Sequence, residues 1–279
     1  MIKDDIGCTS RDNKLVYVHI PKTGGSTVET SELFYNNSRL HYLGFRAPVA
    51  GHHPIDLMME NSEDRGISNF VTATTIRHPC QRFISAFRYV TSSTKCNEGD
   101  QIKAHNKIGD RTLDEFVVYM EDQGWPRTMA HFDKLYPFLM LHKVEPFEVD
   151  TFGVDNVLCQ AQWDEGVQRL ESAIGATPKT IRTLRRKEDE RFLSEMGKLE
   201  GGHKLANKHE TCADLKPETR EALERHYAMD YCLFEYESLP EDGEDVCVGT
   251  GKNKDWFTAK YQECEIELDA QGINWRQGY

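Results

Sequence analysis

The chain of 279 residues lacks two features, and each absence excludes a class of protein. The first is a long hydrophobic run. The longest runs in the sequence are about as long as Phe138–Leu141, far below the roughly 20 residues that a membrane-spanning helix needs. The second is an apolar stretch within residues 1–12, which carry several charged side chains. A signal peptide requires such a stretch, so we expect none there and no membrane segment in this chain.

Positive charge is also in short supply. The chain has 34 Lys and Arg against 46 Asp and Glu, which gives a formal net charge of −12. Broad binding to nucleic acid or to an anionic membrane requires an excess of cations to displace counterions from phosphates. We therefore expect no nucleic-acid partner, and any anion site must be local.

The eight cysteines include no C-x-x-C pair, which argues against zinc ribbons and thioredoxin-like redox sites. The last four have a spacing that suits two disulfides in an oxidising compartment, although free buried thiols fit equally well. These four are Cys212, Cys232, Cys247 and Cys264. With no export signal visible, we expect a cytoplasmic enzyme; the alternative is the Golgi lumen, if an N-terminal anchor has been removed.

Strand-like and helix-like segments alternate along the chain, which predicts an α/β fold with a parallel sheet. Strands are expected at 14–20, 69–76 and 154–160, and helices at 27–34, 79–90, 113–120, 129–141, 164–174 and 216–231. An acidic, turn-rich link begins at Pro240. We therefore divide the chain into a tail (1–13), a main domain (14–238) and a C-terminal extension (239–279).

The strongest motif is His19-Ile-Pro-Lys-Thr-Gly-Gly-Ser-Thr27, between a predicted strand and a predicted helix. Two glycines permit a tight turn whose backbone N–H groups cradle an anion, and the helix N-terminus adds positive potential. Lys22 supplies a cation, and two hydroxyls follow the glycines. The loop differs from a Walker A loop, because its lysine precedes both glycines instead of following them.

A second motif is Ile76-Arg-His-Pro-Cys-Gln-Arg-Phe-Ile-Ser-Ala-Phe87. Arg77 closes a predicted strand, and Ser85 lies about two turns into the next helix. A guanidinium and a hydroxyl that converge on one anion make a phosphate site. By itself the pattern is equally compatible with an ion-paired helix terminus; after a phosphate loop, the binding interpretation is favoured.

Together the two motifs resemble the sulfotransferases that use 3′-phosphoadenosine 5′-phosphosulfate (PAPS), especially the carbohydrate branch that includes heparan sulfate 2-O-sulfotransferase. Weaker similarities are the strand at 154–160, Asn207-Lys208, and the pattern Tyr227-x-x-Asp230-Tyr-x-x-Phe234-x-Tyr236. The resemblance covers roughly residues 14–238. It implies a P-loop-like three-layer fold, with a central parallel sheet flanked by helices.

The resemblance also implies roles for residues. The 5′-phosphosulfate loop would comprise Lys22, Thr23, Gly24, Gly25, Ser26 and Thr27, and the 3′-phosphate site Arg77 and Ser85. The cofactor would be PAPS and the product adenosine 3′,5′-bisphosphate (PAP). Lys22 would stabilise the charge that develops on the leaving phosphate.

A hydroxyl acceptor needs a base, and a histidine that titrates near neutrality suits that task. Gly51-His52-His53-Pro54 lies between the two motifs. His52 falls where the related enzymes often have a Gly-His pair, and His53 beside it is the alternative. A structural role for these histidines is the remaining interpretation.

No metal is expected, because the motifs supply none of the carboxylates that surround a catalytic Mg²⁺. His203, His209 and Cys212 match no common zinc spacing. The acceptor is expected to be a hydroxyl of a small molecule or short sugar, since a chain at −12 is a poor partner for a polyanion. The alternatives are a glycosaminoglycan sulfotransferase, a P-loop nucleotide-dependent kinase, and a non-catalytic nucleotide-binding module. The sequence leaves the oligomeric state open.

Overall fold

The computed structural model describes residues 8–10, 14–25, 28, 52–60, 62–64, 66–92, 106–126, 130–141, 150–175, 211–236 and 251–277. The chain divides into two compact units. The sheet unit comprises residues 1–76, 136–201 and 249–259, and the helical unit comprises 77–135, 202–248 and 260–279. Within the described residues, no helix has the length and apolar character to cross a membrane.

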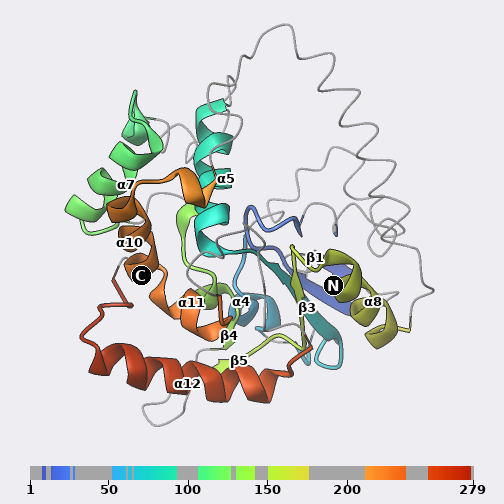
Figure 1. Ribbon diagram of the computed structural model, residues 1–279. Coiled ribbons are helices and arrows are strands. Elements are labelled where there is room, and N and C mark those ends of the chain that lie inside the picture. Colours follow the sequence, from blue (N-terminus) through green and yellow to red (C-terminus); the bar gives the residue numbers. More distant parts are fainter. Residues whose placement is uncertain are drawn as a thin grey trace, which may run out of the picture. The chain divides into compact units, whose positions relative to one another are not determined.

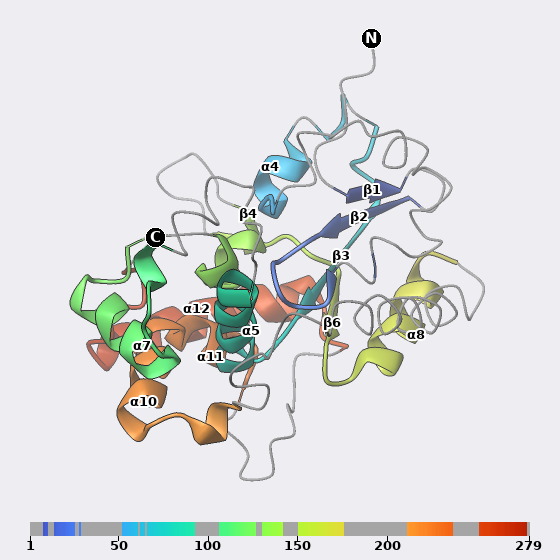
Figure 2. The same ribbon diagram turned by 90° about the horizontal axis from the view of Figure 1, so that it is seen from above.

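The sheet unit is built on four strands in the order β1-β2-β3-β6. Three of them are parallel, namely β2 (Leu15–Val18), β3 (Val71–Ile76) and β6 (Asn156–Cys159), and β1 (Cys8–Ser10) pairs with β2 in the antiparallel sense. Figure 2 shows these strands lying side by side. All four residues of β2 are buried, as expected of strands covered on both faces. The three predicted parallel strands are confirmed.

Helix α8 (Trp163–Ala173) packs on the sheet. Val167 and Leu170 lie in one apolar cluster with Tyr17 of β2 and Leu158 of β6. A side chain at Gly166 would meet Leu158 at 3.2 Å, so the glycine allows helix and strand to approach closely. The helix ends before Gly175, whose φ of 69° suits a glycine C-terminal to a helix.

A small two-stranded sheet of β4 (Met140–Leu141) and β5 (Thr151–Phe152) also belongs to the sheet unit, as does the short helix α4 (Ile55–Met59). Part of the predicted C-terminal extension packs on β5. The ring of Phe257 stacks on Phe152 with centroids 4.4 Å apart, and the Phe152 N–H donates to the Thr258 hydroxyl at 3.0 Å.

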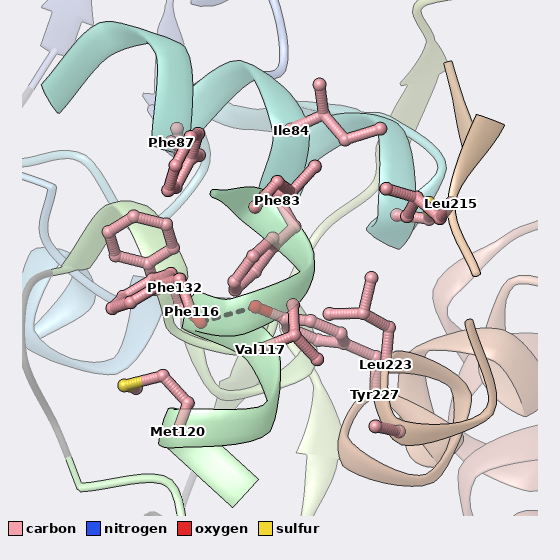
Figure 3. Close-up of a cluster of buried hydrophobic side chains, with 14 of the residues drawn as sticks. Phe83, Ile84, Phe87, Phe116, Val117, Met120, Phe132, Leu215, Leu223 and Tyr227 are labelled. Atoms are coloured by element: carbon pink, nitrogen blue, oxygen red, sulfur yellow. Dashed lines mark hydrogen bonds between the residues drawn. The ribbon is translucent and has the colours of Figure 1, made fainter. Parts of the chain in front are cut away.

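The helical unit contains α5 (Pro79–Ser92), α7 (Leu113–Asp122), α10 (Pro217–His226) and α11 (Ala228–Leu233). Figure 3 shows its core, in which Phe83, Phe116 and Phe132 cluster beside Leu223 and Tyr227. Helix α7 begins with a capping box, because the Thr112 hydroxyl accepts from the Glu115 N–H and the Glu115 carboxylate accepts from the Thr112 N–H.

Two predicted helices are wrong in part. The segment 129–141 forms the 3-10 turns Ala130–Phe132 and Tyr136–Phe138 and then β4, because Pro137 lacks the N–H that a continuous helix requires. The segment 216–231 is divided into α10 and α11 at Tyr227, whose φ and ψ of −97° and 21° depart from helical values.

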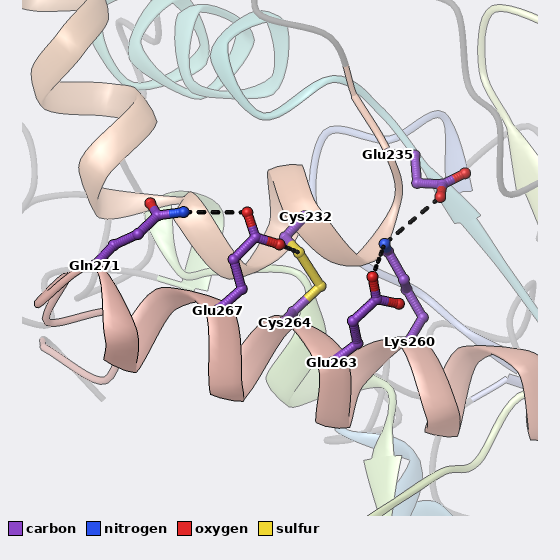
Figure 4. Close-up of a disulfide and its surroundings, with 7 residues drawn as sticks. All are labelled: Cys232, Glu235, Lys260, Glu263, Cys264, Glu267 and Gln271. Atoms are coloured by element: carbon purple, nitrogen blue, oxygen red, sulfur yellow. Dashed lines mark hydrogen bonds and ion pairs between the residues drawn. A yellow bond between two sulfur atoms is a disulfide. The ribbon is translucent and has the colours of Figure 1, made fainter.

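Helix α12 (Lys254–Ala270), labelled in Figure 1, has residues 254–259 in the sheet unit and residues 260–270 in the helical unit. Its Cys264 forms a disulfide with Cys232 of α11 (Figure 4). The Lys260 Nζ lies 3.3 Å from Oε1 of Glu263 and 3.7 Å from Oε1 of Glu235. Figure 4 draws both ion pairs.

A second disulfide joins Cys80 at the start of α5 to Cys212. The expectation that the last four cysteines pair among themselves is therefore wrong for Cys212. Sequence spacing had no means of finding a partner 132 residues away, because the approach of the two backbones depends on packing.

Candidate active site

The loop after β2 has an uncommon backbone conformation. Lys22 has a φ of 66° and Gly24 a φ of 95°, both in the region that L side chains rarely adopt. Strained positions of this kind concentrate at ligand-binding sites. The Thr23 hydroxyl is buried and donates to the Ile20 carbonyl at 2.8 Å, which closes the turn that carries Lys22.

Gly25, the second glycine of the loop, has no room for a side chain. A Cβ there would lie 2.3 Å from Cδ2 and 2.7 Å from Nε2 of His19. His19 thus fills the space that any other residue at position 25 would need. Glycine suits the two positions for different reasons: position 24 has a positive φ, and position 25 lies against the His19 ring.

His52 lies against the same residue. Its Nδ1 is 3.2 Å from the His19 carbonyl oxygen, and the two imidazole rings meet edge to face with centroids 4.8 Å apart. A carbonyl oxygen only accepts, so Nδ1 carries the proton and the lone pair of the neutral ring is on Nε2. This histidine therefore adjoins the glycine loop, and Nε2 is the ring nitrogen that does not carry the proton.

His53, the alternative base, is half-buried. Its Nε2 has no hydrogen-bond partner within the part of the chain that the structure describes. Both histidines directly precede Pro54, the N-cap of α4. The contact with the His19 carbonyl orients the His52 ring.

Sequence reasoning missed Gln160. This residue follows β6, and its backbone N–H donates to the Ile76 carbonyl at 3.0 Å. A Cβ on Gly24 would lie 3.5 Å from its amide nitrogen and 3.7 Å from Trp163. Gln160 therefore borders the glycine loop. Its position after a strand parallel to β2 was the available signal, because parallel strands bring their carboxyl ends to one edge.

The second motif begins at Ile76, the last residue of β3, and β3 is the neighbour of β2 in the sheet. Arg77 is the residue after Ile76 and is half-buried, and Ser85 is half-buried on α5. Both motifs thus follow the carboxyl ends of adjacent parallel strands. That edge is where open α/β sheets bind their ligands.

Aromatic side chains hold the start of the second motif. His78 is 1% exposed, and its ring lies 5.2 Å from those of Tyr231 and Tyr236, each edge to face. Both tyrosines belong to the pattern noted at residues 227–236. Burial raises the pKa of Tyr231, so its phenol stays protonated. The C-terminal pattern thus packs against the second motif.

Arg82, the second arginine of the motif, is fully buried. Its guanidinium donates to the carbonyls of His131, at 3.1 Å, and Asp133, and it lies 5.6 Å from the Tyr227 ring. The Tyr227 hydroxyl donates to the Phe132 carbonyl at 2.6 Å, and burial raises its pKa. Arg82 and Tyr227 therefore both donate hydrogen bonds to backbone carbonyls of the turn at 130–133.

Several predicted residues lie outside the described part of the chain, namely Ser26, Thr27, His203, Asn207, Lys208 and His209. Cys212 is bonded to Cys80, so its sulfur is not a thiolate ligand for a metal. Across the described ranges, no three His, Cys, Asp or Glu residues gather in a way that would hold a metal ion.

No curated protein and no solved structure matches this chain. Residues 8–237, well over half of the sequence, match the sulfotransferase family. The match includes both motifs and ends just after Tyr236. The parallel sheet flanked by helices agrees with the P-loop-like fold that the resemblance implied. The chain belongs to the sulfotransferase family, whose members are enzymes that transfer a sulfonate group.

Proposed function

We propose that this enzyme transfers a sulfonate group from PAPS to a hydroxyl of a small molecule or short sugar. The observation that carries the proposal is the loop after β2, in which Lys22 and Gly24 have positive φ and Gly25 excludes any side chain. Turns of this backbone shape form concavities in which successive N–H groups bind anions. The family match supports a phosphosulfate, rather than the triphosphate of a kinase, as that anion.

The residues present fit such a group. A side chain at Gly24 would fill the space beside Gln160 and Trp163, and one at Gly25 would strike His19. The 5′ side of PAPS would be held by the loop and Lys22, and the 3′-phosphate by Arg77 and Ser85. When bound, PAPS supplies the sulfonate and leaves as PAP.

Lys22 and His52 would have different roles, one at the leaving phosphate and one at the acceptor hydroxyl. The Lys22 ammonium neutralises negative charge that develops on the leaving phosphate, where a fixed cation stabilises the transition state. The Nε2 of His52 accepts the proton of the acceptor hydroxyl, while its Nδ1–H stays bonded to the His19 carbonyl. His53 is the second candidate for the base.

The proposed acceptor is a neutral or cationic small molecule or a short sugar. The chain carries 46 acidic against 34 basic side chains, so its overall field opposes a long polyanion. A glycosaminoglycan is the alternative acceptor, and a basic surface would have to override that field.

The two disulfides favour the Golgi lumen over the cytoplasm as the compartment of this protein. The pairs Cys80–Cys212 and Cys232–Cys264 are of a kind that persists in oxidising compartments and is rare in the cytosol. We therefore propose that the protein matures in an oxidising lumen such as that of the Golgi. Free thiols at these four positions in protein isolated from its native source would return the cytoplasm to first place.

Calorimetric titration with PAP tests the central proposal, with ATP and ADP plus Mg²⁺ titrated in parallel. Metal-independent binding of PAP, with little response to ATP, is the expected result. Arg77→Ala should weaken PAP binding by about tenfold or more, because a bidentate charged contact is lost. A preference for ATP with Mg²⁺ would overturn the proposal in favour of a kinase.

A further inference from the structure

We propose that His19 is a positioning residue that sets the tautomer and orientation of the base His52. This inference rests on the proposed function, in which His52 accepts the proton of the acceptor. Three contacts carry it, and all three lie within the sheet unit: one between the His19 carbonyl and His52, one between the two rings, and one between the His19 ring and Gly25.

The backbone contact selects the tautomer. The His19 carbonyl accepts from Nδ1 of His52 at 3.2 Å, which stabilises the neutral form with its proton on Nδ1. An isolated histidine prefers the opposite form, with the proton on Nε2, in which that nitrogen cannot act as a base. The bond to His19 therefore determines whether Nε2 of His52 accepts a proton.

The ring contact fixes the orientation. The two imidazoles meet at 84° with centroids 4.8 Å apart, so the His19 ring limits how the His52 ring turns about its side-chain bonds. Without it, the Nδ1–H would lose its alignment with the carbonyl. A hydrogen bond weakens steeply as its angle closes, so the tautomer preference would weaken with it.

The contact with Gly25 links this device to the cofactor loop. Carbon and nitrogen atoms of the His19 ring occupy the place of a Cβ at position 25, at 2.3 and 2.7 Å. The ring thus contacts both the His52 ring and the backbone at Gly25. An alanine at position 25 would displace the ring and, through it, His52.

Nuclear magnetic resonance of ¹⁵N-histidine-labelled protein measures the tautomer directly, without cofactor or turnover. In the wild-type protein His52 should be protonated on Nδ1. In His19→Ala the His52 signals should move toward the Nε2-protonated form. His19→Phe keeps an aromatic ring in place and should restore the wild-type tautomer, and it also covers the case in which the alanine variant fails to fold.

Steady-state kinetics with PAPS follows. In His19→Ala we expect kcat to fall on the order of tenfold, while the KM for PAPS stays within about twofold, because only the base is misaligned. His19→Phe should recover most of kcat. Trp256→Ala is the matched control, since it removes a ring from another edge-to-face pair of the same unit, in which Trp256 meets Phe257 at 84° and 5.0 Å.

A double-mutant cycle tests the link to Gly25. Gly25→Ala should shift the His52 tautomer as His19→Ala does. In the double variant the tautomer should shift no further than in the more affected single variant. Additive losses would contradict the proposed link between the loop and the base.

The outcomes separate this inference from the proposed function. A wild-type tautomer and wild-type kcat in His19→Ala would overturn the positioning role while leaving sulfonate transfer intact. If the tautomer depends on His19 and yet the wild-type protein neither binds PAP nor uses PAPS, the proposed function fails and the contact is only structural.

Discussion

The two motifs, one after β2 and one at the start of α5, are held in place by different means. After β2, the loop depends on its own backbone: Lys22 and Gly24 have positive φ, and Gly25 accepts no Cβ beside His19. At the start of α5 the backbone is an ordinary helix, and side chains hold it. A disulfide at Cys80 and the buried guanidinium of Arg82 attach α5 to other segments of the helical unit.

The difference indicates where each motif is vulnerable. A loop shaped by its backbone loses function when a side chain in it changes, while the fold, which depends on the strands around it, is retained. A helix held by distant segments should lose stability when those attachments are removed. We expect ligand affinity at that helix to fall as a consequence. Three changes test this contrast, from the largest expected effect to the smallest.

Removing the disulfide of the second motif should have the largest effect on stability. Cys80→Ala with Cys212→Ala should lower the free energy of unfolding by about 5 kcal/mol, because a loop of 132 residues is released in the unfolded chain. Urea denaturation measures the loss. The matched pair Cys232→Ala with Cys264→Ala, separated by 32 residues, should cost about 4 kcal/mol.

Only the first pair should also weaken PAP binding, because Cys80 lies between Arg77 and Ser85 in the chain. Equal effects of both pairs on PAP affinity would contradict a specific link between the Cys80 disulfide and the phosphate motif.

Removing the charge of the first motif should affect the reaction and leave the stability of the fold unchanged. Lys22→Ala should lower kcat by about 10²–10³-fold, as is typical when one stabiliser of developing negative charge is removed. The urea midpoint should stay unchanged. Lys14→Ala is the matched control, since Lys14 also has a positive φ, of 48°, and flanks the same strand. Full activity of Lys22→Ala would remove the loop from the mechanism.

Replacing the buried arginine should have the smallest effect of the three. Arg82→Met leaves the carbonyls of His131 and Asp133 without their donor and should lower the free energy of unfolding by about 2 kcal/mol. Arg82→Lys should recover only part of this, because an ammonium lacks the planar fork of a guanidinium. An unchanged urea midpoint in Arg82→Met would show that α5 does not depend on this contact.

Local patterns predicted much of this protein. The strands β2, β3 and β6 and the helices α5, α7 and α8 follow from runs of β-branched residues, apolar periodicity and the stop signal at Gly175. The glycine loop was recognisable for the same reason, since its residue types restrict the backbone directly. The interrupted helix at 129–141 shows the limit, because its apolar pattern outweighed the effect of Pro137 in that prediction.

The site was only partly visible in the sequence. Lys22, His52, Arg77 and Ser85 were found from motifs, and their roles remain predictions. Gln160 was missed because its place beside Gly24 arises from strand pairing between residues about 136 positions apart in the chain.

By itself, the sequence determined the α/β fold class, the loop with its lysine and two glycines, and the family, because each depends on residues close together in the chain. Only the tertiary structure decided that Cys212 pairs with Cys80, that Arg82 is buried beneath Tyr227, and that the His19 carbonyl orients His52. The physical reason is that these contacts join segments 33 or more residues apart, so they form only when the packed core brings the segments together.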